Sequence, residues 1–137
     1  EKSESELRKK WMRMLKATNP HDTISDNISV WPTGTKIDVY RKINITNEII
    51  IYEIKVGRGS PQHLYQLKMY WDGLVLQGEQ PKEGILLVEG YATNLEQMVN
   101  LMNQIPPPNF PTPKPGARTQ QSGQYNFIIR KHSDVNL

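Results

Sequence analysis

Residues 48–70, EIIIYEIKVGRGSPQHLYQLKMY, constrain the fold of this chain most, because they predict a strand, a glycine turn and a helix. Side chains alternate across a strand, so one face of this strand carries Ile49, Ile51, Glu53 and Lys55. The other face is apolar, and a strand with apolar residues on both faces lies inside a sheet. A buried acid and base are costly unless they are paired or bound to a metal. Glu53 and Lys55 are therefore the sharpest anomaly in the sequence.

The segments around this strand alternate between helical and extended patterns. A capping box at Ser3 and Glu6 opens a helix with apolar residues at i, i+4, i+7 and i+8. The further pattern predicts strands at 27–31, 36–43 and 84–90, helices at 61–72 and from 93, and a last strand at 125–131. We therefore expect an α/β fold, with a mixed central β-sheet flanked by helices in the order α-β-β-β-α-β-α and a C-terminal edge strand.

Length and local composition indicate how the domain is divided. At 137 residues the chain is long enough for one domain with its own core. We expect residues 1–104 to form that core, 105–124 to be a flexible Pro/Gln-rich segment, and 125–137 to be an edge strand and tail. The final strand could reach a neighbouring molecule and make a homodimer. The chain starts with Glu1 rather than Met, so we expect it to be part of a larger protein.

Charge and cysteine content limit the partners. Residues 1–20 and 106–137 each carry a net charge of +3, whereas the middle carries −3. Basic ends around an acidic centre suit a polyanion such as DNA, but lysines scattered for solubility give the same pattern. The absence of cysteine fits a reducing compartment, so a cytoplasmic location is expected. No apolar run is long enough for a membrane span, and no membrane partner is expected.

The hairpin formed by residues 36–55 brings two acids together. If it is symmetric about 44–47, paired residue numbers sum to 91, and Asp38 lies opposite Glu53. Directly opposed side chains have Cβ atoms roughly 5 Å apart, so the two carboxylates repel each other. A divalent cation resolves that repulsion, and Mg²⁺ favours such oxygen ligands, with the Ile54 backbone carbonyl as a third. Mn²⁺ is expected to substitute.

The neighbouring residues supply the other parts of a phosphodiester-hydrolysing site. Lys55 would orient the metal-activated water or stabilise the transition state, and Gln66 would position Lys55 or the phosphate. Glu4 falls on the buried stripe of the first helix, either as a further site residue or as a first-turn acid near the helix dipole. Tyr70 is one additional candidate site residue. Four further residues are candidate contacts to phosphate or DNA: Arg58, Ser60, Gln62 and Lys36.

Asp38, Glu53-Ile54-Lys55 and Gln66-Leu67-Lys68-Met69-Tyr70 resemble the PD-(D/E)xK nuclease superfamily, nearest to its RecB-like and phage-type members. The resemblance covers roughly residues 1–90 and departs from the pattern where Asp38 follows Lys36-Ile37 instead of a proline. It implies a Mg²⁺-dependent DNA endonuclease or exonuclease that leaves 5′-phosphate and 3′-hydroxyl ends.

Two alternatives stay open. One is a catalytically inactive nuclease-fold domain that binds nucleic acid or protein. The other is an unrelated α/β domain in which Glu53 and Lys55 pair on an exposed strand face. The three histidines have no partner at metal-ligand spacing and are interpreted as surface or helix-edge residues.

Overall fold

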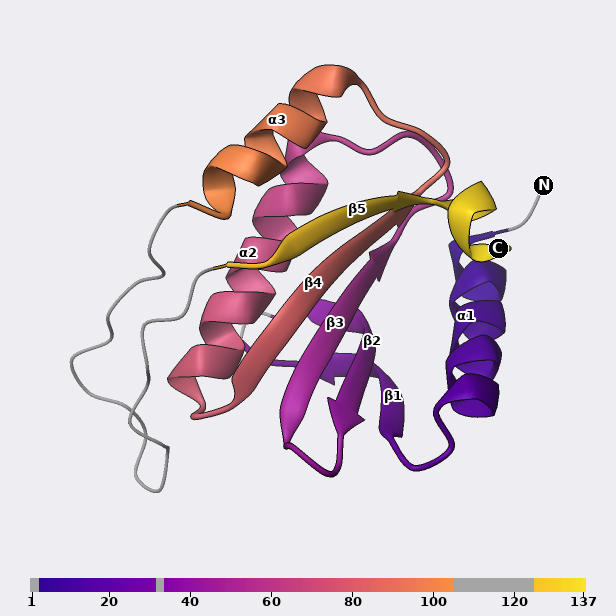
Figure 1. The fold of residues 1–137 in the computed structure, drawn as a ribbon, viewed down its shortest axis with the longest axis vertical. Coiled ribbons are helices and arrows are strands. Elements are labelled where there is room, and N and C mark those ends of the chain that lie inside the picture. The colour runs from indigo at the N-terminus through magenta and orange to yellow at the C-terminus, as the bar shows by residue number, and fades with distance from the viewer. Residues whose placement is uncertain (1–2, 32–33, 105–124) are drawn as a thin grey trace.

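A five-stranded sheet with helices on both faces forms the body of the domain (Figure 1). The structure is a computed structural model and describes residues 3–31, 34–104 and 125–137. The observed element order confirms the predicted α/β fold. The elements are α1 (Glu4–Thr18), β1 (Thr23–Ser29), β2 (Lys36–Ile43), β3 (Glu48–Ile54), α2 (Pro61–Leu76), β4 (Gln80–Val88), α3 (Thr93–Met102), β5 (Phe127–Lys131) and a final 3-10 turn, η1 (His132–Val135).

The strand order across the sheet is β1-β2-β3-β4-β5, so β3 is central. The first two pairs, β1 with β2 and β2 with β3, are antiparallel, whereas β3 with β4 and β4 with β5 are parallel. The sheet is therefore mixed, as predicted, and β5 lies at an edge. Because β3, β4 and β5 run the same way, their carboxyl ends meet at one end of the sheet (Figure 1).

The two faces of β3 belong to different packing layers. Ile49 and Ile51 are fully buried in the layer formed with α2 and α3. Tyr52 and Ile54 point to the other face, where they pack in one cluster with Leu7 of α1. Figure 1 shows α1 on one side of the sheet and α2 with α3 on the other. Glu53 alternates with Ile49 and Ile51 and therefore lies on the α2 face.

Several boundaries differ from those predicted. The first strand occupies Thr23–Ser29 rather than 27–31, and β4 begins at Gln80, four residues before the predicted start. The second helix continues past residue 72 to Leu76 despite Gly73. A Cβ at Gly73 would lie 2.8 Å from Nε1 of Trp31, so the helix needs a glycine where that indole packs.

The final strand packs on the body of the domain. β5 pairs with β4, and both Tyr125 and Phe127 are 2% exposed in the α2-side core. Their rings lie against Trp71 of α2 at centroid distances of 5.7 and 5.4 Å. The Pro/Gln-rich segment predicted at 105–124 lies outside the described residues. Within the described ranges, none of the helices has the length and apolar character needed to span a membrane.

Candidate active site

The register predicted from the turn at 44–47 is confirmed. Val39 pairs with Tyr52 and Tyr40 with Ile51, and each pair of numbers sums to 91. The paired register ends at Val39 and Tyr52, and the next residues of the two strands are Asp38 and Glu53, whose carboxyl groups lie close enough for Asp38 to affect the pKa of Glu53. The backbone of β3 also holds the Asp38 side chain in place, because its Oδ2 accepts a hydrogen bond of 2.9 Å from the Ile54 backbone N–H. The hairpin therefore brings the two acids together on the α2 face.

Glu53 is the most perturbed acid of the site. It is 2% exposed, and its Oε2 atom is buried without a hydrogen-bond partner. Burial, followed by hydrogen bonding with Asp38 and the charge of Asp38, raises the pKa of Glu53 from 4.5 to about 9. The charge of Lys55 acts in the opposite direction and is too weak to offset the burial. Without a cation, Glu53 is therefore protonated at neutral pH.

Lys55 follows β3 directly and pairs with an acid from a different element. Its Nζ lies 3.9 Å from Oε1 of Glu4, at the start of α1, and the two side chains are 23% and 49% exposed. Glu4 is thus a half-exposed acid in the first turn of α1, at the rim of the site. Because Glu53 is buried and Lys55 pairs with Glu4, the alternative of a Glu53–Lys55 pair on an exposed strand face is wrong.

Tyr70 is packed beside the two carboxyl groups. Its hydroxyl donates a 2.8 Å hydrogen bond to the backbone carbonyl of Lys36, which ties α2 to the start of β2. Burial raises the pKa of Tyr70 above its ordinary value, and the charges of Glu53 and Asp38 add to this effect. The hydroxyl therefore stays protonated and holds the backbone next to Asp38.

The other predicted residues lie on α2, on the loop before it and at the start of β2. Gln66 is half-buried on α2, and within the described ranges no hydrogen bond joins it to Lys55. Ser60 is the N-cap of α2, whereas Arg58 and Gln62 are exposed on either side of it. Lys36 is exposed at the start of β2, which lies at the same end of the sheet because β2 runs antiparallel to β3. Their roles toward a substrate stay predictions.

His63 lies near the site, although its sequence position indicated only a surface or helix-edge residue. Its Nδ1 accepts a 3.1 Å hydrogen bond from the Ser60 backbone N–H. Burial lowers the pKa of His63, the charge of Lys55 lowers it further, and Glu4 acts in the opposite direction. His63 is thus neutral and near the Glu4–Lys55 pair. The signal was its place three residues after the N-cap, where a side chain reaches back to the cap backbone.

The residues present fit a magnesium ion. The donor set offers carboxylate oxygens from Asp38 and Glu53, and the buried, unpartnered Oε2 of Glu53 is an acceptor that a cation would satisfy. Among the described residues no group of three or more His, Cys, Asp or Glu side chains could hold a metal. Mg²⁺ is compatible with this, because proteins commonly bind it through one or two carboxylates together with waters and substrate phosphates.

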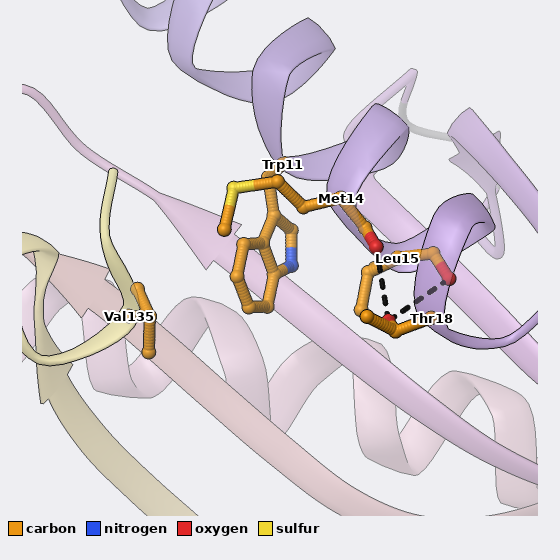
Figure 2. A pocket seen from close by; sticks show the side chains of 5 residues that line it. All are labelled: Trp11, Met14, Leu15, Thr18 and Val135. Atoms are coloured by element: carbon orange, nitrogen blue, oxygen red, sulfur yellow. Dashed lines mark hydrogen bonds between the residues drawn. The ribbon is translucent and has the colours of Figure 1, made fainter.

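A cavity elsewhere in the domain is apolar. It has a volume of about 240 Å³ and lies between α1 and η1, lined by Trp11, Met14, Leu15, Thr18 and Val135 (Figure 2). The Thr18 hydroxyl is turned to the helix backbone, donating to the Met14 and Leu15 carbonyls. The cavity therefore offers no charged group for phosphate chemistry, and it lies across the sheet from Asp38 and Glu53.

Comparison with solved structures finds a similar fold in a protein described as a repair endonuclease and in two structures of EndoMS. The crystal structure of a repair endonuclease from Pyrococcus abyssi superposes with a TM-score of 0.64 and 16% identity, over 96% of this chain and 47% of that chain. An EndoMS–dsDNA2 complex gives a TM-score of 0.59 and 18% identity, over 94% of this chain and 44% of that chain.

EndoMS in apo form gives a TM-score of 0.54 and 21% identity, over 74% of this chain and 43% of that chain. No family model matches the chain, and no curated protein matches it in sequence. At these identities the likeness shows the fold alone, so the chain has the fold of these repair endonucleases. It spans less than half the length of each of them.

Proposed function

We propose that this domain is a metal-dependent DNA nuclease of the PD-(D/E)xK type that hydrolyses phosphodiester bonds. The observation that carries the proposal is the buried Glu53 facing Asp38, with Lys55 two residues further along the chain. A buried acid beside a second, half-buried acid costs stability, so a fold that keeps this arrangement has a use for it at a site. The similarity in fold to repair endonucleases, one of them in complex with double-stranded DNA, supports DNA as the substrate.

The side chains of the site have separate roles in hydrolysis. Asp38 and Glu53 would hold Mg²⁺ together with the Ile54 carbonyl, and the ion would acidify a bound water and neutralise charge on the phosphate. Lys55 supplies a fixed positive charge beside the reacting phosphate, where negative charge increases in the transition state. The Glu4 carboxylate keeps the Lys55 ammonium at the rim of the site. Gln66, Arg58, Ser60, Gln62 and Lys36 would bind and orient the DNA strand.

A domain that keeps the fold but only binds nucleic acid or protein is the second candidate. The departure from the superfamily pattern before Asp38 favours it, because the first metal ligand is then less well defined. Binding alone does not require two carboxyl groups facing each other in the sheet. Metal binding and cleavage therefore separate the two candidates.

The test compares Lys55→Ala with a matched control, Lys82→Ala, on plasmid and linear DNA in Mg²⁺. Lys82 is an exposed lysine paired with Glu48 at 4.0 Å, as Lys55 is paired with Glu4 at 3.9 Å. Because Lys55 is placed to act on the reaction, its loss should abolish cleavage and leave the melting temperature within a few degrees. Lys82→Ala should keep both the cleavage activity and the melting temperature of wild type.

Calorimetry with Mg²⁺ completes the test. Wild type and Lys55→Ala should bind the ion, whereas Glu53→Ala should not. A wild-type protein that binds neither Mg²⁺ nor Mn²⁺ and cuts no DNA would be a binding module, and the nuclease proposal would fail. Near wild-type cleavage by Lys55→Ala would remove that residue from the mechanism.

A further inference from the structure

Two loops at the carboxyl end of the sheet are joined by backbone hydrogen bonds. The loop after β3 and the loop after β4 are linked from Gly59 N–H to the Gly90 carbonyl at 2.8 Å, and from Glu89 N–H to the Gly57 carbonyl at 3.0 Å. Figure 1 shows both loops at the end of the sheet where β3, β4 and β5 terminate. These hydrogen bonds therefore fix the backbones of the two loops beside the end of β3, where Lys55 lies.

An aromatic ring and two cations lie on these loops and at the neighbouring end of β5. Tyr91, half-buried, follows β4, and the Nζ of Lys131 at the end of β5 lies 5.8 Å from its ring centroid. Arg58 is exposed on the neighbouring loop, and its Nη1 is 3.7 Å from the position of a Cβ at Gly90, the residue before Tyr91. Glu89 is the acid of the same loop and is also exposed. Three segments distant in sequence thus supply one aromatic ring and two positive charges.

The position of this cluster relative to Lys55 suits one nucleic-acid strand. Arg58 follows Lys55 by three residues, a separation of at most about 11 Å for a fully extended chain. Phosphates of one DNA strand succeed each other at about 3.4 Å along the duplex axis. A phosphate at Lys55 would therefore have neighbours within roughly three nucleotides that reach the loops after β3 and β4.

We propose that Tyr91, Arg58 and Lys131 form a subsite for an unpaired nucleotide of the DNA strand, with the base stacked on Tyr91 and the backbone held by the two cations. The identity of the ligand rests on the proposed function. An aromatic ring flanked by positive charge is the usual means of holding single-stranded nucleic acid, because every base has a face that stacks. At 5.8 Å the Lys131 ammonium is near the outer limit of a cation–π contact. A base can therefore displace it toward a phosphate.

The test uses fluorescence anisotropy of a labelled oligothymidylate of about 12 nucleotides, a length within the range of such sites. EDTA prevents cleavage, and the second probe is the same strand with its central bases removed. Wild type should bind the intact strand roughly 5- to 100-fold more tightly than the strand lacking bases. Tyr91→Phe should keep this preference, because phenylalanine still stacks, and Tyr91→Leu should lose it while still filling space against the core.

Tyr65→Leu is the matched control, because Tyr65 is a 56% exposed tyrosine on α2 outside this cluster, and it should keep the preference. Lys131→Ala should weaken binding to both strands and lower the slope of log affinity against log salt by about one. This variant removes only an exposed side chain, so it tests the subsite even if Tyr91→Leu does not fold.

The subsite is overturned if wild type does not distinguish the two strands, if folded Tyr91→Leu still does, or if Lys131→Ala leaves the salt slope unchanged. Cleavage of double-stranded DNA in Mg²⁺ is measured separately. Cleavage without any preference for bases removes the subsite and leaves the nuclease. A preference that depends on Tyr91 in a protein that never cleaves supports the subsite and removes the nuclease.

Discussion

Replacing Glu53 by glutamine is expected to stabilise the metal-free protein at neutral pH. Glu53 has a pKa of 4.5 when exposed, and burial raises it to about 9 in the folded protein, with Asp38 contributing. Between these two values the folded state holds one more proton than the unfolded state. The free energy of unfolding therefore falls by about 1.4 kcal/mol for each pH unit gained in this window.

Stability falls with rising pH because the pKa of Glu53 is higher in the folded protein than in the unfolded one. A group with a raised folded pKa contributes its full stability below the unfolded pKa and loses it as the pH rises toward the folded pKa. From about pH 5.5 to 7.5 the loss at Glu53 is about 3 kcal/mol, the product of two pH units and the slope. Glutamine keeps the shape of the protonated acid and does not titrate. Glu53→Gln should therefore be the more stable protein at pH 7.5, by up to that amount.

Urea unfolding followed by tryptophan fluorescence, in EDTA at about pH 5.5, 6.5 and 7.5, measures the effect. Glu89→Gln is the control, since Glu89 is an exposed acid next to β4, and its pH dependence should match that of wild type. If wild type and Glu53→Gln lose stability with pH at the same rate, Glu53 is not protonated in the folded state. Burial would then not raise the pKa of Glu53 above neutral pH.

Binding of Mg²⁺ should offset the loss of stability that the two neighbouring acids cause. Binding to the native state alone should raise the melting temperature of wild type in proportion to the logarithm of the Mg²⁺ concentration. Asp38→Asn removes one proposed ligand, so the rise should be much smaller. An equal rise in both proteins would show that the ion binds away from Asp38.

Two further predictions concern the packing that carries the site. Gly84→Ala places a Cβ 2.7 Å from Cδ1 of Phe127 and should cost roughly 1–3 kcal/mol in urea unfolding, whereas Gly57→Ala, with nothing within 4 Å, should be near neutral. Equal effects would mean that β5 can shift away from Gly84. Tyr125→Phe removes a 2.6 Å hydrogen bond to the buried Asp72 and should cost about 1–3 kcal/mol, and an unchanged urea midpoint would contradict this.

Sequence patterns of short range determined much of the architecture. The period of two in residues 48–54 gave β3 with its two faces, and the four-residue connection at 44–47 gave the register with β2. The opposition of Asp38 and Glu53 could be predicted because it depends only on that register. Patterns over a few residues are informative here because alternation and short turns leave few arrangements for a hairpin.

Element ends were predicted less well, because they depend on what packs against them. The second helix was predicted to end at residue 72, yet α2 continues through Gly73 to Leu76, and Trp31 packs where a side chain at residue 73 would stand. Both β1 and β4 were predicted to begin too late in the sequence, because the start of neither strand carries a strong local signal. Contacts with distant segments decided these residues.

Only the tertiary structure decided which residues surround the two acids. Glu4 reaches Lys55 across 51 positions of sequence, and the loops after β3 and β4 meet because their strands are parallel neighbours. The burial that raises the pKa of Glu53 likewise requires α2 to cover that face of the sheet. Sequence periodicity shows which residues share a face, but not which helix covers it. Long-range contacts form only when the whole sheet and its helices assemble.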